Sequence, residues 1–291
     1  MAERSMNPTV KTFFHTPTFT ASHLVYDPAS KYAAIIDSAL DFDVKSGRTR
    51  TKSADEIIAF VRENKLVVDW VLETHVHADH LTAAPHLKAQ LGGKTGIGRR
   101  VVEVQGTFAR IYNTIDVKTD GSQFDHLFSD GETFSLGGVQ ARVMHTPGHT
   151  PACVTYVIGD AAFVGDTLFM PDYGTARCDF PGGDAAQLYR SIQKMFALPP
   201  ETRLFLCHDY KAPGRDQFVW EISVAEQRAR NIHIHDGISE AEFVAMRTKR
   251  DATLDMPVLL WPSVQVNMRA GHLPAKESNG TAYLKIPLNA V

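Results

Sequence analysis

The feature that most constrains this chain is a cluster of histidine and aspartate directly after an apolar run. Val67–Leu72 predicts a buried β-strand, and His75, His77, Asp79 and His80 follow it within a few residues. Side chains two residues apart in an extended segment point the same way, so His75 and His77 converge on one point. Asp79 and His80 lie past the turn and are directed toward a neighbouring point. Because imidazole and carboxylate groups suit zinc, iron and manganese, the cluster predicts a metal site at a strand end.

Further residues of these types follow other predicted strands. Each lies just beyond a short apolar run, where side chains emerge from a sheet into a loop. They are His149 after residues 139–144, Asp166 after residues 161–164, and His208 after residues 203–207. Four strands that end in potential ligands indicate a metal site at one edge of a sheet.

Apolar runs alternate with helical patterns along most of the chain, which predicts an α/β fold. We expect one domain over residues 1–291, with an irregular, mostly extended C-terminal part from about residue 257. Besides 67–72, strands are expected at 24–26, 32–36, 133–136, 139–144, 154–158, 161–164 and 203–207. Helices are expected near 53–64, 81–91, 99–113, from 184 onward, and near 218–230 and 239–250, with an irregular segment at 114–130.

Three helix starts carry capping signals. Ser53–Glu56 and Ser239–Glu242 match the capping box, in which the side chains of the first and fourth residues bond each other's backbone N–H. Asp184 is of the type that caps a helix N-terminus, and Leu188 and Ile192 lie on one face of the helix it would begin.

Composition excludes several classes of partner and location. The chain's 30 Lys and Arg oppose 33 Asp and Glu, a net charge of −3, which gives no electrostatic case for nucleic acid or an anionic membrane. No apolar run approaches a membrane span, and residues 1–19 show no secretory signal. The three cysteines, Cys153, Cys178 and Cys207, are too few for a disulfide framework and fit a reducing compartment. The sequence therefore predicts a cytoplasmic protein.

The full ligand set resembles the pattern of the metallo-β-lactamase superfamily. The resemblance in residue type, order and spacing extends over nearly the whole chain. Its residues are His75, His77, Asp79, His80, His149, Asp166 and His208. The resemblance implies a four-layer αββα sandwich with the metal at one edge, between the two sheets. It is weakly specific for the reaction, because the superfamily hosts many chemistries.

Two branches of that superfamily remain as alternatives. In glyoxalase II-like thioester hydrolases, all seven residues hold two metals, commonly zinc, which make a hydroxide available to attack the thioester. Persulfide dioxygenases keep the seven residues but hold one ferrous ion. By resemblance, its ligands are His75, His149 and Asp166, a triad that leaves positions open for substrate and O₂. His77, Asp79, His80 and His208 would then orient ligands and water.

The long segment from about 99 to 130 looks closer to the bacterial β-lactamase-like hydrolases of sulfide detoxification. Three other segments favour the dioxygenase branch. They are Gly174–Phe180 with Arg177 and Asp179, Cys207–Tyr210, and Val266–Arg269 with its Asn-Met-Arg sequence. The chain departs from the family pattern at Ala176 and Cys178, and its segment from about 99 to 130 is longer than in the mitochondrial-type enzymes.

The resemblance implies a low-molecular-weight persulfide as substrate, such as glutathione persulfide, oxidised with O₂ to sulfite and the thiol, and a homodimer. Arg177 and Asp179 would pair near the metal, and Arg177 would bind a substrate carboxylate or serve as a structural ion pair. Lys211 and Arg215 would supply further positive charge, and Tyr210 a hydroxyl beside the metal. Cys178 would lie near the substrate sulfur or simply pack in the core.

Overall fold

The computed structural model describes residues 7–289. Its largest elements are two six-stranded sheets. The first sheet has the order β1-β2-β3-β6-β8-β9; β1, β2 and β3 are antiparallel, and β3, β6, β8 and β9 are parallel. Its strands are β1 (Thr9–His15), β2 (Thr20–Tyr26), β3 (Tyr32–Ile36), β6 (Val67–Leu72), β8 (Lys94–Gly98) and β9 (His126–Phe128).

The second sheet has the order β10-β11-β12-β13-β14-β15 and is antiparallel except between β13 and β14. Its strands are β10 (Thr133–Leu136), β11 (Val139–His145), β12 (Val154–Ile158), β13 (Ala161–Phe163), β14 (Arg203–Phe205) and β15 (Glu221–Ser223). A small third sheet joins β5 (Arg48–Arg50), β4 (Ala39–Asp43) and β7 (Leu81–Thr82).

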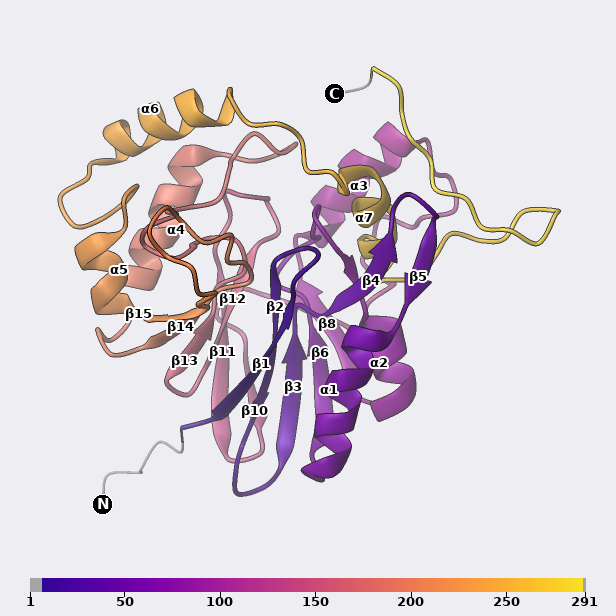
Figure 1. Ribbon diagram of the computed structural model, residues 1–291, viewed down its shortest axis with the longest axis horizontal. Coiled ribbons are helices and arrows are strands. Elements are labelled where there is room, and N and C mark those ends of the chain that lie inside the picture. Colours follow the sequence, from indigo (N-terminus) through magenta and orange to yellow (C-terminus); the bar gives the residue numbers. More distant parts are fainter. Residues whose placement is uncertain (1–6, 290–291) are drawn as a thin grey trace.

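Helices cover the outer faces of the two sheets, and Figure 1 shows α4, α5 and α6 on one side and α1 and α2 on the other. The chain after α6 crosses the top of the molecule to reach α7, which lies beside α3. The helices are α1 (Lys52–Glu63), α2 (Ala84–Leu91), α3 (Val101–Tyr112), α4 (Ala185–Phe196), α5 (Val224–Arg230), α6 (Glu240–Asp251) and α7 (Leu260–Asn267).

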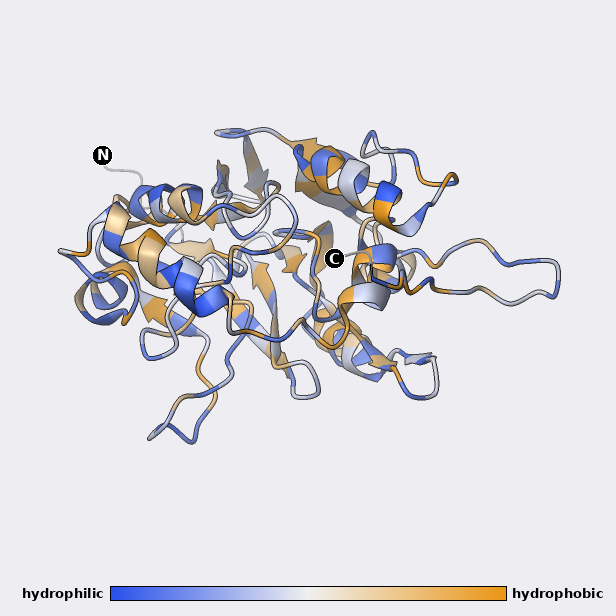
Figure 2. Ribbon diagram, turned by 90° about the horizontal axis from the view of Figure 1, so that it is seen from above, coloured by the Kyte–Doolittle hydropathy of each residue, from blue (hydrophilic) through white to orange (hydrophobic). Residues whose placement is uncertain are grey.

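The alternation of side chains along the strands explains the layers. On β3, Ala33 and Ile35 pack under α1 and α2, whereas Ala34 and Ile36 face the second sheet. Both sets are fully buried, as expected for a strand covered on both faces. Figure 2 shows the same division, with hydrophobic strands inside and hydrophilic surfaces on the outer helices. The predicted four-layer αββα sandwich is therefore confirmed.

Two of the predicted helix starts are confirmed and one is wrong. The Asp184 side chain accepts the backbone N–H of Gln187 at the start of α4, and Ser239 forms a complete capping box on α6. The predicted capping box at Ser53 does not form. Because α1 begins at Lys52, with Thr51 as the capping residue, Ser53 already lies within the helix. The Ser53 hydroxyl and backbone N–H instead donate to the Asp41 carboxylate on β4.

Further differences concern elements that the sequence pattern did not mark. Residues 221–223 pair with β14 as β15, so the helix expected from 218 begins only at Val224. Residues 260–267, expected to be extended, form α7. The strands β1, β4, β5, β7, β8 and β9 were not expected. No helix among residues 7–289 is both long enough and apolar enough to cross a membrane.

The buried His23 on β2 predicts an acid-dependent loss of stability. Its Nε2–H donates to the Leu206 carbonyl oxygen and its Nδ1 accepts from the Thr12 hydroxyl. Burial lowers the pKa of His23 to about 4. Between pH 7 and 5 the unfolded chain therefore binds a proton that the native state excludes, and this group alone costs about 2 kcal/mol of unfolding free energy.

Urea unfolding of the metal-free wild type and the His23→Gln variant at pH 7 and pH 5 measures this contribution. The wild type should lose about 2 kcal/mol more than the variant over that interval. Other titrating groups are common to both proteins and cancel. Equal losses in the two proteins would show that His23 is not the responsible group.

Candidate metal centre

The seven predicted ligands meet at one edge of the sandwich, where strands of both sheets end. β6 delivers the segment from His75 to His80, and β11 leads into the turn that carries His149. β13 is followed by Asp166 and β14 by His208. All seven are buried except Asp79, which is partly exposed. The structure thus brings together every residue of the motif.

Three of the seven form one group around a common point. The Nε2 atoms of His75 and His149 each lie 3.7 Å from Oδ2 of Asp166. One ligand atom from each of the three lies within 4.8 Å of the other two. This spacing allows two imidazoles and one carboxylate to hold a single ion.

The other four residues form a second group next to the first. It contains His77, Asp79, His80 and His208, again with one potential ligand atom of each within 4.8 Å of the rest. Nε2 of His208 lies 3.1 Å from Oδ2 of Asp79 and 3.4 Å from Oδ1 of Asp166. The Asp166 carboxylate therefore faces both groups, one oxygen toward each.

The donor atoms at this edge fit a bound cation. Six side-chain atoms of the motif are buried and make no hydrogen bond among the described residues, which is costly unless another partner satisfies them. They are Nε2 of His75, His80 and His208, Nδ1 of His77, Oδ2 of Asp79 and Oδ1 of Asp166. Such a converging set of unpartnered nitrogen and oxygen atoms is what a metal ion satisfies.

The protonation states also suit ligation. Burial, followed by the neighbouring imidazoles, lowers the pKa of His75 well below its usual value. The pKa of His80 falls to about 4 for the same two reasons. Burial opposes ionisation of Asp79, but His208 and His80 outweigh it and hold the pKa of Asp79 below its ordinary range. His75 and His80 are therefore neutral imidazoles and Asp79 an ionised carboxylate, the forms that bind metals.

His77 has a different environment, created by two carboxylates that the sequence analysis missed. Its Nε2 lies 3.0 Å from Oδ1 of Asp37 and 3.1 Å from Oε2 of Glu73. Burial alone would lower the pKa of His77. The Asp37 carboxylate, and to a lesser extent the Glu73 carboxylate, outweigh burial and raise this pKa well above 6.5. Asp37 follows β3 as directly as Asp166 follows β13, so the strand-end signal was present in the sequence.

A sharp turn and one carbonyl orient His149. The preceding Gly148 has a φ of 138°, and a Cβ there would lie 2.3 Å from the backbone nitrogen of Leu188 on α4. Nδ1 of His149 donates to the Arg177 carbonyl oxygen at 2.9 Å, which leaves Nε2 to face Asp166. The Arg177 segment therefore fixes the ring orientation of a predicted ligand.

The predicted pairing of Arg177 with Asp179 is present. Two bonds of 2.6 Å join the guanidinium to the two carboxylate oxygens, and a third, also 2.6 Å, runs to the Asp255 carbonyl oxygen. Arg177 thus ties the loop after the Asp166 motif to the segment that crosses the molecule between α6 and α7.

Asn267, in the Asn-Met-Arg segment, holds the metal-binding loop from the other side. Its Nδ2 donates to the carbonyl oxygens of His77 and His80, at 2.9 and 2.7 Å, and its Oδ1 accepts the backbone N–H of Thr82. A residue nearly 190 positions away in sequence therefore fixes the backbone between two motif histidines.

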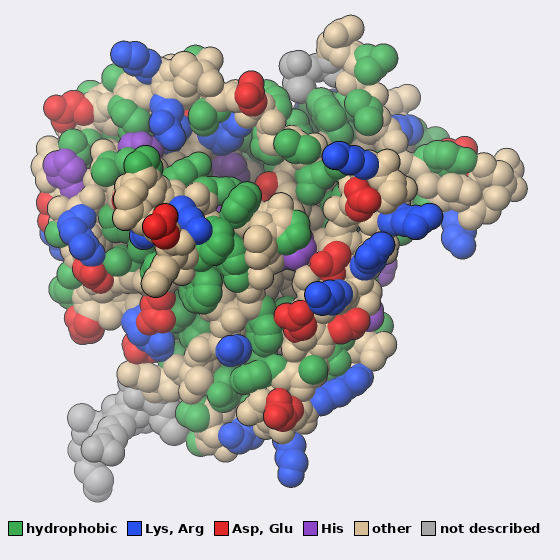
Figure 3. All heavy atoms as spheres, in the orientation of Figure 1, with side chains coloured by type: hydrophobic (Ala, Val, Ile, Leu, Met, Phe, Trp, Pro, Cys, Tyr) green, Lys and Arg blue, Asp and Glu red, His purple; other side chains and the backbone are tan. Residues whose placement is uncertain are grey.

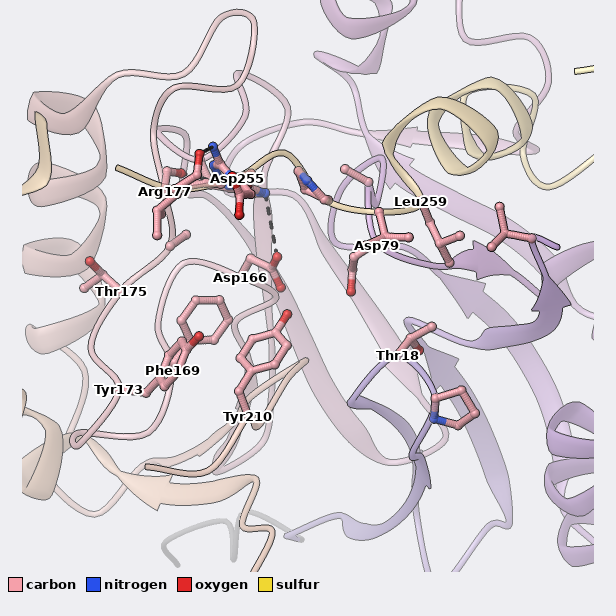
Figure 4. A pocket seen from close by; sticks show the side chains of 18 of the residues that line it. Thr18, Asp79, Asp166, Phe169, Tyr173, Thr175, Arg177, Tyr210, Asp255 and Leu259 are labelled. Atoms are coloured by element: carbon pink, nitrogen blue, oxygen red, sulfur yellow. Dashed lines mark hydrogen bonds and ion pairs between the residues drawn. The ribbon is translucent and has the colours of Figure 1, made fainter. Parts of the chain in front are cut away.

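The metal edge opens into a cavity of about 720 Å³, referred to below as the large cavity. Its walls include Asp79, His149 and Asp166 together with Phe169, Tyr173 and Tyr210. Figure 4 shows the Tyr210 hydroxyl directed toward the Asp166 carboxylate. Burial raises the pKa of Tyr210 well above its usual value, so the hydroxyl keeps its proton.

The remaining predicted site residues lie elsewhere. Arg215 uses its guanidinium to bind Asp209 and Asp172, and the Lys211 ammonium lies 4.4 Å from the centre of the Phe218 ring. Neither lines the large cavity, so the structure does not bring them to the predicted substrate site. The Cys178 thiol is buried and also outside the cavity wall.

Other basic side chains occupy the position beside the large cavity that was expected for Lys211 and Arg215. Lys45, after β4, and Arg250, on α6, line the large cavity, and the fully buried Arg247 lies at its wall. No signal in the sequence marks them, because their approach to the metal edge depends on how α6 and the small sheet pack. On the face seen in Figure 3, hydrophobic side chains gather between the two halves, with charged groups toward the edges.

Comparison with known proteins identifies the family. The model of the metallo-beta-lactamase superfamily matches residues 14–208. A probable metallo-hydrolase of Burkholderia pseudomallei is 58% identical over 294 residues, covering 97% of this chain and 100% of the relative. Glyoxylase B2 of Dictyostelium discoideum is 50% identical over 283 residues, covering 96% and 97%.

Persulfide dioxygenases match at lower identity but over most of the chain. Human mitochondrial persulfide dioxygenase ETHE1 is 28% identical over 265 residues, covering 90% of this chain and 88% of the relative. The crystal structure of ETHE1 from Myxococcus xanthus superposes with a TM-score of 0.72 at 29% identity, covering 91% and 100%. The ligand set, the sandwich and these matches together show that the chain belongs to the metallo-beta-lactamase superfamily.

Proposed function

We propose that this protein is an iron(II)-dependent dioxygenase that oxidises a low-molecular-weight persulfide, with glutathione persulfide as the model substrate. The reaction RSSH + O₂ + H₂O → RSH + SO₃²⁻ + 2H⁺ balances, because the terminal sulfur gives four electrons to O₂. The observation that carries the proposal is the group of His75, His149 and Asp166, whose potential ligand atoms all lie within 4.8 Å of one another. Two imidazoles and one carboxylate with open positions are typical of O₂-using iron(II) enzymes.

In the one-iron proposal, His77 lies outside the triad and has a positioning role. Its Nε2 donates to Oδ1 of Asp37 and lies 3.1 Å from Oε2 of Glu73, which fixes the orientation of the ring. Its Nδ1, buried and without a hydrogen bond among the described residues, would orient water or a ligand beside the iron. Ferrous iron held by the triad would supply the redox chemistry and the open coordination positions that O₂ requires.

The chain's own residues divide the remaining tasks. The large cavity would hold the thiol carrier, with Lys45 and Arg250 near its carboxylates and the aromatic rings against its apolar parts. The Tyr210 hydroxyl, protonated at neutral pH, would donate a hydrogen bond beside Asp166. Arg177, already paired with Asp179, would hold His149 through its carbonyl rather than bind substrate.

An oxygen electrode and elemental analysis test the proposal. Protein purified without air should contain about one iron per chain and consume one O₂ per sulfite formed from glutathione persulfide. Two zinc ions per chain, thioester cleavage and no O₂ uptake would instead establish a hydrolase. Two observations favour this second candidate. The group of His77, Asp79, His80 and His208 could hold a second metal, and the two relatives with identities of 58% and 50% are named as a hydrolase and a glyoxylase.

The variant His77→Ala separates the two candidates in a second way. With one iron in the triad, metal content should stay near that of the wild type, because His77 lies outside the triad. With two metals, one equivalent should be lost. The matched control is His75→Ala, which should strip the metal in either case. A His77→Ala protein that loses metal in parallel with His75→Ala would contradict the one-iron proposal.

A further inference from the structure

A second, smaller cavity lies against the metal edge. Its volume is about 70 Å³, compared with about 720 Å³ for the large cavity. Ala78, His149, Arg177 and Pro257 line both cavities, so these residues form the partition between them. The small cavity therefore reaches a predicted metal ligand, His149, by a route separate from the large one.

The rest of the small cavity is mainly hydrophobic. The buried part of the cavity is formed by Phe108 on α3, by Leu260 on α7 and by Phe180 in the loop before α4. Each of these side chains is less than a tenth exposed. Met256, which is 53% exposed, lies at the surface and marks the mouth. The charged groups in the wall, Arg177 and Asp179, are paired with each other and leave no unsatisfied charge toward the cavity.

Size and polarity restrict what the cavity can hold. A volume of about 70 Å³ has room for a diatomic molecule or a xenon atom, and none for a peptide-sized thiol. Apolar cavities do not retain ordered water, because a buried water needs polar partners, and they bind small apolar guests instead. The centre of the Phe180 ring lies 5.9 Å from the centre of the His149 ring. Because both rings line this cavity, a guest in it lies next to one of the three residues of the triad.

We propose that the small cavity is a binding and entry site for dioxygen, which passes His149 to reach the triad while the persulfide occupies the large cavity. The inference rests on the proposed function, since a hydrolase has no use for dioxygen. Separate routes have a physical advantage here: a thiol carrier bound in the large cavity closes that side of the metal edge to the second substrate.

Xenon tests the site without any enzymatic activity. Crystals of the wild-type protein pressurised with xenon should show an anomalous peak between Phe108, Phe180 and Leu260. An empty small cavity in crystals that take up xenon elsewhere would overturn the inference. Because this experiment uses the unmodified chain, it does not depend on whether any variant folds.

Steady-state kinetics tests the route. Met256→Trp places a larger side chain at the exposed mouth and should lower kcat/KM for O₂ by about tenfold, with KM for the persulfide unchanged. Leu260→Phe narrows the buried part and should act in the same direction. Rates are compared per bound iron, so that differences in metal content do not enter.

The matched control is Val258→Trp. Val258 lies two residues from Met256 on the same crossing segment, is 85% exposed, and lines the large cavity but not the small one. This variant should change KM for the persulfide and leave kcat/KM for O₂ unchanged. The same O₂ dependence in Met256→Trp, Val258→Trp and wild type would overturn the inference alone, whereas a wild type that consumes no O₂ would overturn the proposed function as well.

Discussion

The Asp166→Ala variant should contain no bound metal and should lose activity by at least about a thousandfold. Asp166 is the carboxylate of the triad, with Oδ2 3.7 Å from Nε2 of both His75 and His149. Its other oxygen faces His208 at 3.4 Å, so the same residue serves the second group. Removing it takes the single anionic ligand from the triad and leaves two imidazoles, which hold a divalent ion weakly. Elemental analysis after dialysis, together with the turnover rate, measures both effects.

The control for Asp166→Ala is Asp160→Ala in the turn between β12 and β13. Asp160 pairs with Arg203 at the surface and lies outside both metal-binding groups. This variant should keep the wild-type metal content and rate. Retention of a full metal complement in Asp166→Ala would show that the triad does not hold the metal.

The second large effect is on stability and comes from a buried ion pair on α6. Arg247 is 1% exposed, and its guanidinium bonds Oδ1 of Asp251 at 2.6 and 2.9 Å. The other oxygen of Asp251 accepts the backbone N–H of Cys178, while Arg247 donates to the Thr175 carbonyl oxygen. Asp251→Ala leaves a buried guanidinium unpaired and should lower the free energy of unfolding by about 3–5 kcal/mol. Urea unfolding of metal-free protein measures this loss.

Two comparisons test the cause of that loss. Glu240→Ala removes an exposed pair with Arg190 at the start of the same helix and should leave the unfolding midpoint nearly unchanged. The double variant Arg247→Met with Asp251→Leu removes both charges and should recover part of the stability, but not all of it, because the backbone N–H of Cys178 still loses its acceptor. If Asp251→Ala and Glu240→Ala cost the same, the buried pair has no special contribution.

The predicted strands were most accurate where a turn residue marks an end, as Gly137 does for β10 and Gly159 for β12. Residues 32–36, 67–72, 133–136 and 154–158 form strands with the expected bounds. The errors include β1, which has seven residues, as well as shorter elements. β15 has three residues and α7 eight, and neither is long enough to establish a period against its neighbours. Both owe their conformation to pairing or packing with segments far away in sequence.

The residues of the site also divide into those that the sequence marks and those that only the packing of the chain brings there. The seven motif residues could be found from sequence, because the chemistry of a metal requires particular side chains and strand ends deliver them to one edge. Asp37 and Glu73, which lie beside Nε2 of His77, were missed: Asp37 carried a strand-end signal after β3, whereas Glu73 carries no signal until its partner is known. Lys211 and Arg215 were proposed on nearness in sequence to His208, but the chain turns them to Phe218 and to Asp209 and Asp172 instead.

By itself, then, the sequence determined the superfamily and which His and Asp residues meet at one edge of the sandwich, because these depend on residue types that recur at fixed places along the chain. The tertiary structure alone decided how the ligands divide into three and four, and which carbonyl orients His149. It also decided which side chains enclose the two cavities. These properties depend on distances of a few ångströms between residues up to about 190 positions apart, and such distances exist only once the layers have packed.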